Sequence, residues 1–305
     1  MCRGMTHTPD TPLDPVDALI RLGGVATWPE LRALTSRRKL RTAVSAGRVI
    51  ELTRPYYALP ETDQALAAAI RLGGTVSHLS AAQRWGWKVK TPPALPTITV
   101  PRWRHHLDPD GVEVHWGNLA PDAVQGRVTS PVQTVVDCAR TYSFDEALAV
   151  ADSALRGGVD HDSLLDAAKA SPRTGRRKAM EVVEAADGRA ANPFESVLRG
   201  IAKRVPGLEV EPQQWVGDVG RADLMDRRLG LVIEAESFEF HADSASFGRD
   251  VRRYTLFVRS GFIVVRFTWK DVMLDPDYVR AVLADLVAQG PYGRAVRCPS
   301  CAAAA

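Results

Sequence analysis

Apolar and polar residues alternate at helical spacing in three short segments near the N-terminus. In PVDALIRLGG, residues 15–24, this pattern predicts a helix that ends at two glycines. Thr27 and Glu30 have the spacing of a capping box, so a second helix is expected to begin between them. Ser36 and Gly47 are suited to begin and end a third helix. The chain therefore opens with three short helices.

A basic surface is expected on the third helix and on the segment that follows it. The β-branched and aromatic run VIELTRPYYAL, residues 49–59, predicts a two-stranded wing. Residues 13–60 are thus typical of a winged helix-turn-helix domain, whose third helix enters the major groove of DNA. The basic residues gather on the third helix and the wing: Arg37, Arg38, Lys39, Arg41, Arg48 and Arg54. We predict that they bind double-stranded DNA. The alternative is a solvated basic face on a small helical domain.

The middle of the chain, residues 61–188, alternates small helices with short strands. This pattern predicts an α+β domain. Its histidines have neither metal-ligand spacing nor a carboxylate partner that the sequence identifies: His78, His105, His106 and His115. Structural or surface roles are therefore favoured over a site.

Two strands around a turn are predicted in RADLMDRRLGLVIEAESFEF, residues 221–240. Side chains alternate along a strand, so Val232, Glu234 and Glu236 share one face of the second strand. A turn near residues 227 and 228 would place Asp223 close to residue 232, within diagonal reach of Glu234. Three carboxylates are then expected in one small region.

Such a cluster needs cations or protons, because buried like charges repel and lose solvation. A divalent ion such as Mg²⁺ meets this need, since it prefers oxygen ligands and commonly takes one or two carboxylates. The alternative is a sheet edge where the carboxylates simply reach water.

Helices are predicted on either side of these strands. Asn192 and Pro193 begin one helix and place Glu195 in its first turn. A second helix, residues 244–261, carries arginines at spacings of three and four: Arg249, Arg252 and Arg253. A near-continuous apolar strand follows at residues 262–272. This order predicts a central sheet flanked by helices, with the carboxylates along one edge.

The composition of the chain adds little to this prediction of the fold. The 305 residues, 45% hydrophobic and 25% charged, are enough for several cores and indicate a soluble globular chain. No apolar run reaches the roughly 18 residues of a membrane span, and the N-terminal residues lack the apolar run of a signal peptide. We therefore expect a cytoplasmic protein without a membrane partner. Cys298 and Cys301 form a CxxC without a second ligand pair, in an expected flexible tail at residues 291–305.

The N-terminal part resembles a known family in three stretches. They are GGVATWPELRALTSRRKLRTAVSAGRVIELTRPYYAL, GGTVSHLSAAQRWGW and TSPVQTVVDCAR. Residues 15–160 are similar to the AbiEi-type antitoxins of bacteria. That resemblance implies a winged helix that represses its own operon and a middle domain that neutralises a nucleotidyltransferase toxin, which would be a protein partner.

Residues 192–280 resemble the PD-(D/E)XK nuclease superfamily, in the branch similar to very-short-patch-repair endonucleases. The similarity lies in Glu195, RADL, LVIEAES, His241 and the arginines of the following helix. It implies a restriction-endonuclease-like α/β sandwich with a central mixed sheet at residues 189–290. It also implies Mg²⁺ or Mn²⁺ on Asp223 and Glu234, with hydrolysis of a DNA phosphodiester. The implied catalytic residues are Glu195, Asp223, Glu234, Glu236, His241, Arg249 and Arg252.

The sequence departs from that superfamily at one position. Glu236 stands where the signature has a lysine two residues after the second acid. Arg249, Arg252 or Lys270 would then have to supply the positive charge. Two functions follow from the sequence. One is a DNA-binding, metal-dependent endonuclease, and the other is an AbiEi-like autorepressor or antitoxin whose nuclease-like domain is inactive.

Overall fold

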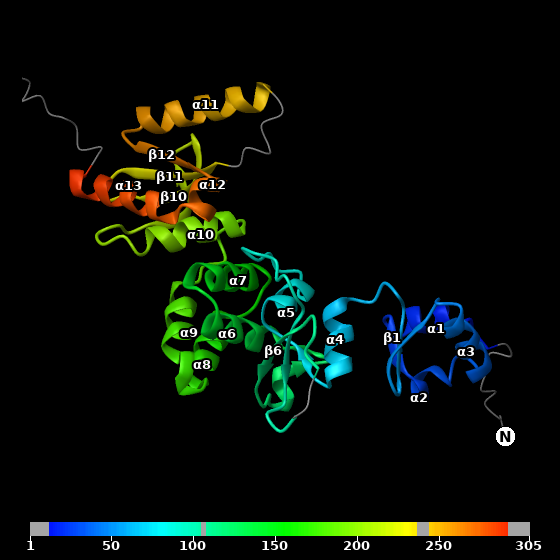
Figure 1. The fold of residues 1–305 in the computed structure, drawn as a ribbon. Coiled ribbons are helices and arrows are strands. Elements are labelled where there is room, and N and C mark those ends of the chain that lie inside the picture. The colour runs from blue at the N-terminus through cyan, green and yellow to red at the C-terminus, as the bar shows by residue number, and fades with distance from the viewer. Residues whose placement is uncertain (1–11, 105–107, 237–243, 292–305) are drawn as a thin grey trace, which may run out of the picture. The chain divides into compact units, whose positions relative to one another are not determined.

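The computed structural model describes residues 12–104, 108–236 and 244–291. Helices and three β-sheets make the chain a mixed α/β protein, as the predicted mixture of helices and strands requires, and the finer fold assignments stay predictions (Figure 1). Contacts divide the chain into two compact units, Met1–Ala81 with Pro93–Ser130 and Ala82–Pro92 with Pro131–Ala305. The domain boundaries predicted at residues 60 and 188 stay predictions. In the described part, no helix is long and apolar enough to cross a bilayer.

The first unit begins with the three predicted helices. Its elements are α1 (Pro15–Arg21), β1 (Val25–Thr27), α2 (Trp28–Leu31), α3 (Arg37–Ser45), β2 (Ile50–Thr53) and β3 (Tyr56–Ala58). The Thr27 N–H donates to the Glu30 carboxylate at 2.7 Å, and the Lys39 N–H donates to the Ser36 hydroxyl at 3.3 Å. Both predicted caps are therefore confirmed. The strands pair in the order β1-β3-β2, which adds a third strand to the predicted wing.

A five-stranded sheet forms the rest of the first unit, in the order β6-β5-β4-β8-β7. The elements between residues 64 and 129 are α4 (Gln64–Leu72), β4 (Thr75–Val76), α5 (His78–Arg84), β5 (Thr97–Val100), β6 (Glu113–Trp116), the 3₁₀ helix η1 (Pro121–Ala123), β7 (Val124–Gln125) and β8 (Val128–Thr129). β4 runs antiparallel to β5 and parallel to β8, so this sheet is mixed. Every residue of β5 is buried, which explains its unbroken run of β-branched side chains.

Helices come first in the second unit. They are α6 (Pro131–Thr141), α7 (Phe144–Arg156), α8 (His161–Ala170), α9 (Arg173–Ala185) and α10 (Pro193–Ala202). A buried ion pair joins α7 to α10, because the Arg199 guanidinium donates to the Asp152 carboxylate at 2.6 and 2.7 Å. α10 thus packs on the helices before it as well as on the sheet after it.

The sheet of the second unit has the order β12-β11-β10-β9. Its elements and flanking helices are β9 (Glu211–Val216), β10 (Gly220–Asp226), β11 (Leu231–Glu236), α11 (Ser244–Arg259), β12 (Ile263–Thr268), α12 (Trp269–Leu274) and α13 (Pro276–Gln289). β9, β10 and β11 are antiparallel, whereas β11 and β12 are parallel. The central sheet is therefore mixed, as predicted.

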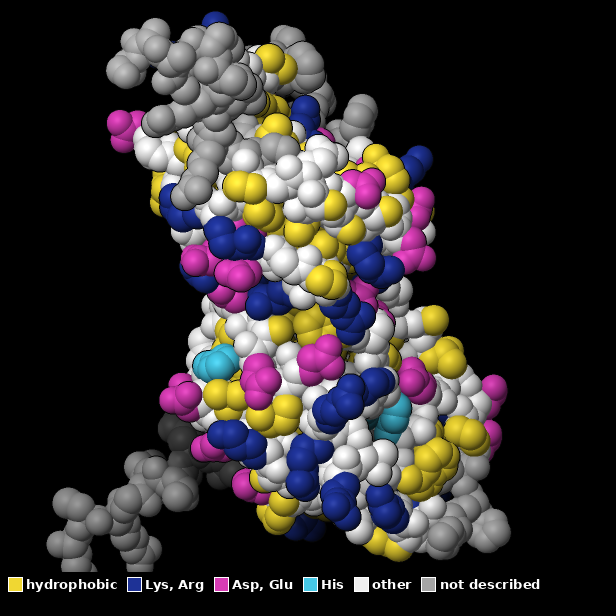
Figure 2. Space-filling model, turned by 90° about the vertical axis from the view of Figure 1, so that its left-hand side faces the viewer, with side chains coloured by type: hydrophobic (Ala, Val, Ile, Leu, Met, Phe, Trp, Pro, Cys, Tyr) yellow, Lys and Arg dark blue, Asp and Glu magenta, His cyan; other side chains and the backbone are white. Residues whose placement is uncertain are grey.

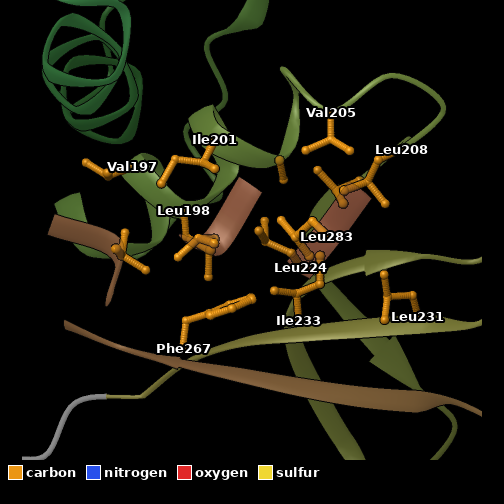
Figure 3. Packing of buried hydrophobic residues seen from close by; sticks show 14 of the residues in the cluster. Val197, Leu198, Ile201, Val205, Leu208, Leu224, Leu231, Ile233, Phe267 and Leu283 are labelled. Carbon is orange, nitrogen blue, oxygen red and sulfur yellow. The ribbon is translucent and has the colours of Figure 1, made fainter. Parts of the chain in front are cut away.

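Apolar side chains cover both faces of this sheet. On one face, Leu198 of α10, Leu283 of α13 and Ile233 of β11 belong to one buried cluster (Figure 3). On the other face, Val232 packs in a second cluster with Phe257 of α11. Figure 1 shows α11 on one side of the strands and α10 and α13 on the other. The alternation predicted for β11 is confirmed, so Glu234 and Glu236 share the face of Val232.

Candidate functional site

Glu195 is held at the N-terminus of α10. Its N–H donates to the Asn192 side chain at 3.0 Å, and the Asn192 amide donates back to its carboxylate at 2.8 Å. The Ala191 N–H donates to the same carboxylate at 2.9 Å. The side chain is 6% exposed, and the positive end of the helix dipole favours a negative charge there. The predicted N-cap is confirmed, and it fixes the position of this carboxylate.

Asp223 and Glu234 lie side by side on neighbouring strands. The Asp223 N–H donates to the Glu234 carboxylate at 3.2 Å, and the Ala235 N–H donates to the Asp223 carboxylate at 2.9 Å. The predicted position of Asp223 near residue 232 is wrong, because Leu224 pairs with Ile233 and the turn lies further along the chain. The two acids are therefore direct neighbours across the ladder.

Gln213 on β9 links the acids of the helix and the sheet. Its side-chain amide donates to Glu195 at 2.7 Å and to Asp223 at 3.3 Å. Its backbone φ of 56° lies in the left-handed region, which a residue other than glycine rarely adopts. The sequence analysis did not identify Gln213. The only signal for it in the sequence is a polar side chain in the run EPQQWV, residues 211–216.

Arg253 on α11 supplies the positive charge next to these acids. Its guanidinium donates to the Glu234 carboxylate at 2.7 Å and to the Arg221 carbonyl at 3.2 Å. The predicted cations Arg249, Arg252 and Lys270 all have exposed side chains. Their proposed roles stay predictions, and the sequence analysis gave no separate role to Arg253, which binds Glu234.

Glu236, at the position of the signature lysine, has its own partners. The Arg266 guanidinium of β12 donates to its carboxylate, with Nε at 3.0 Å, and the Tyr254 hydroxyl donates to it at 2.9 Å. The Arg266 guanidinium also lies 4.2 Å from the centre of the Tyr254 ring. Glu236 is thus neutralised within the fold. The predicted His241 lies outside the described residues.

The carboxyls of this site hold protons more tightly than usual. Burial, followed by the negative charge of Asp223, raises the pKa of Glu234 to about 8. The same two causes raise the pKa of Glu195 to about 7. Burial also raises the pKa of Asp223 above its ordinary value. Near neutral pH, protons therefore neutralise part of the cluster where no added cation does so.

Two of the carboxylates fit a divalent cation. Among the described residues, no three His, Cys, Asp or Glu side chains are grouped to hold one metal ion. The four oxygens of Asp223 and Glu234 each accept a hydrogen bond, from Gln213, Ala235, the Asp223 N–H and Arg253. A carboxylate oxygen has two lone pairs, so both side chains keep room for an ion. Mg²⁺ commonly binds through one or two carboxylates plus water and substrate phosphate.

The other candidate site is the basic surface of α3. Leu40 and Ala43 of this helix are buried, whereas Arg37, Arg38 and Arg41 are exposed. Figure 2 shows a different face of the molecule, on which Lys and Arg side chains also gather in the lower half of the view.

The six predicted DNA-binding residues differ in their partners. Arg48 pairs with Asp14 at 3.1 Å and Arg54 with Glu51 at 3.2 Å, whereas Lys39 donates to the Pro12 carbonyl. The described residues provide no acidic partner for the arginines of α3: Arg37, Arg38 and Arg41. These three arginines are therefore the best placed to meet an external anion.

The remaining sequence observations give no further site. His78 is buried, its ring lies 3.8 Å from that of His115, and its Nδ1 is 2.8 Å from the Ser77 hydroxyl. Structural roles for these two histidines stay the prediction. His105, His106 and the CxxC of Cys298 and Cys301 lie outside the described residues.

The chain is a mixed α/β protein with a cluster of carboxylates at its last sheet. No protein-family model matches the chain. The chain is 30% identical over 270 residues to the uncharacterized protein Rv2248 of Mycobacterium tuberculosis strain H37Rv, a match that covers 82% of this chain and 96% of the relative. The uncharacterized protein MT2308 of strain CDC 1551 matches with the same identity and coverage. The chain belongs to the family of these mycobacterial proteins.

A solved structure is also similar, more distantly. The crystal structure of the RV2827C protein from Mycobacterium tuberculosis aligns with a TM-score of 0.36 and 16% identity. The alignment covers 66% of this chain and 83% of that chain.

Proposed function

We propose that the protein binds double-stranded DNA and hydrolyses its phosphodiester bonds at a metal-dependent site in the second unit. The observation that carries this proposal is the meeting of Glu195, Asp223 and Glu234, from a helix and two strands, beside the guanidinium of Arg253. Two buried carboxylates and one half-buried carboxylate, all with raised pKa values, destabilise the folded chain when they are charged and unpaired. A cation and a phosphate group together would balance them.

The residues of the site would act in distinct ways. Asp223 and Glu234 would hold Mg²⁺ or Mn²⁺, and the bound ion would supply an acidified water and positive charge for the phosphate oxygens. Arg253 already lies against Glu234, where a second positive charge can meet the substrate. Glu195, with a pKa of about 7, can take up or release a proton near neutral pH.

In this proposal, an arginine supplies the positive charge that the lysine of the superfamily signature would supply. Arg266 neutralises Glu236, so that acid adds no net charge next to the phosphate. Arg253 then supplies the cation from α11 rather than from β11. The site thus has the charge balance of the superfamily signature with a different arrangement of residues.

Plasmid cleavage tests the proposal. Purified protein is incubated with supercoiled plasmid in Mg²⁺ or Mn²⁺, with EDTA in a parallel sample. We expect nicked and linear DNA to form only where the metal is available. DNA binding without any cleavage in either metal would contradict the proposed hydrolysis.

A second function is favoured by one specific observation. Both acids of β11 are already bound to arginines: Glu234 binds Arg253, and Glu236 binds Arg266. This is the arrangement expected of an inactive nuclease-like domain. The protein would then be a DNA-binding repressor or antitoxin, with a nucleotidyltransferase toxin as its partner. Copurification with the product of a neighbouring nucleotidyltransferase gene would support this function.

The arginines of α3 are expected to bind DNA. Replacing Arg38 or Arg41 by Glu should weaken binding to a labelled duplex about tenfold, because a phosphate contact is lost and a repulsion is added. The log–log salt dependence of the affinity should also fall by about one unit. Fluorescence anisotropy at several salt concentrations measures both. Arg21→Glu, on α1, changes the charge equally outside α3 and serves as the control. Equal affinities in all variants would show that α3 is only a solvated basic face.

Metal affinity is expected to rise with pH. The raised pKa values mean that an ion must displace protons from Glu234 or its neighbours, so binding releases protons. If one proton is released, the Mn²⁺ affinity should rise about tenfold per pH unit below pH 8. Electron paramagnetic resonance of free Mn²⁺ measures this at pH 6 and pH 8. An affinity independent of pH over this interval would contradict the prediction.

A further inference from the structure

Gln213 of β9 binds acids from both the helix and the sheet of the acidic site. Its amide nitrogen carries two hydrogens and lies 2.7 Å from a Glu195 oxygen and 3.3 Å from an Asp223 oxygen. One side chain therefore donates to two carboxylates on separate elements. Without such a donor, the charges of Glu195 and Asp223 would repel each other, since each lies within the other's electrostatic field.

The backbone of Gln213 makes a purely structural role hard to explain. Its φ of 56° lies in the left-handed region, which glycine adopts readily and which residues with a Cβ adopt only with strain. Glycine would suit this turn of the strand better than Gln213 if only the path of the chain mattered. Strained residues of this kind persist where the surrounding structure imposes them, often at functional sites.

Gln214, the next residue of the strand, also has a side-chain amide but does not bind the acids of the site. The Gln214 side chain donates to the Pro212 carbonyl at 3.2 Å and makes no bond to the acids of the site. Gln213, with its left-handed backbone, binds the two carboxylates, whereas Gln214 does not. Backbone strain and side-chain contact thus occur at the same residue.

We propose that Gln213 is a positioning residue that holds Glu195 and Asp223 as one unit, so that Asp223 and Glu234 can take a divalent cation. This inference rests on the proposed function. Gln213 contacts no ion in this arrangement. It donates to Glu195 and to one oxygen of Asp223. The other lone pairs of the Asp223 carboxylate remain available to other partners.

Two substitutions separate this role from a structural one. Gln213→Gly removes the amide and relieves the left-handed backbone, and Gln213→Asn keeps an amide on a shorter side chain that also tolerates this backbone. A purely structural role predicts that both variants have a lower melting temperature, whereas the folded protein keeps the wild-type Mn²⁺ affinity. The positioning role predicts that both keep their melting temperature but bind Mn²⁺ about tenfold or more weakly, as other substitutions around metal ligands do.

The experiment measures Mn²⁺ binding by electron paramagnetic resonance, together with thermal unfolding and plasmid cleavage. Gln214→Ala is the matched control and should retain the wild-type Mn²⁺ affinity. Wild-type affinity in Gln213→Gly, with cleavage intact, would overturn the positioning role and leave the proposed hydrolysis in place. Failure of the wild-type protein both to bind Mn²⁺ and to cleave DNA would instead overturn the proposed function, and the positioning role with it.

Discussion

Replacing Asp223 by Asn, or Glu234 by Gln, is expected to reduce metal-dependent DNA cleavage about a thousandfold. Each change removes a charged ligand from the pair that would hold the ion, and metal catalysis is worth several kcal/mol of transition-state stabilisation. Plasmid nicking in Mn²⁺ measures the effect. DNA binding through α3 should be unchanged, because α3 belongs to the first unit.

The pH dependence of stability in the same variants separates lost chemistry from lost folding. The pKa of Glu234 rises from an ordinary value of 4.5 to about 8 in the folded protein. The folded state then holds its proton more tightly than the unfolded chain, so the stability that this group adds at low pH is lost as the pH rises through 8. Glu234→Gln lacks this loss, so its stability relative to that of the wild type should be higher at pH 8 than at pH 4.

Urea denaturation at the two pH values checks this expectation, with Asp277→Asn as the control. Asp277 on α13 has a side chain that is 84% exposed, so its replacement should change neither stability nor cleavage. Cleavage by Asp223→Asn and Glu234→Gln at the wild-type rate would assign the activity to another site or to another protein.

Asp152→Ala is expected to destabilise the second unit by about 3–5 kcal/mol. The Asp152 and Arg199 side chains are 0% and 1% exposed, and the Asp187 N–H also donates to Asp152 at 2.8 Å. Removing the acid leaves a guanidinium buried without its counter-ion, which is the costly way to break such a pair. Urea denaturation followed by circular dichroism measures the change in the free energy of unfolding.

Two further variants give this prediction its controls. Asp166→Ala removes an exposed acid that lies 3.6 Å from Lys169 on α8, and it should cost less than about 1 kcal/mol. Replacing both Asp152 and Arg199 by apolar residues of similar size should recover most of the lost stability. A small effect of Asp152→Ala would show that Arg199 finds another partner or reaches water.

The local signals of the sequence were sufficient for the main elements. Asn192 and Pro193 predicted the start of α10, and the alternation of apolar and acidic residues predicted the two faces of β11; both are confirmed. These features depend on neighbouring residues alone, through capping and strand periodicity. The acids that a helix cap and a strand face place in the site could therefore be named from the sequence.

The contacts between distant elements could not be predicted in this way. Gln213 reaches the site because of an unusual backbone angle, and a strand pattern gives no sign of it. Arg253 was recognised as one of three arginines at helical spacing, and only the packing of α11 decides which of them meets Glu234. Asp152 lies in an amphipathic helix where an acid normally reaches water, so its burial against Arg199 was missed.

The parallel pairing of β11 with β12 determines the order in which the charges of the site can meet during folding. β10 and β11 are joined by a short turn, so Asp223 and Glu234 come together through a local contact. β12 and α11 join only after the chain crosses over, through residues 237–262, which is a slower, non-local closure. We therefore expect the two acids to come together before Arg253 during folding, with protons from the solvent as their available counter-charge until then.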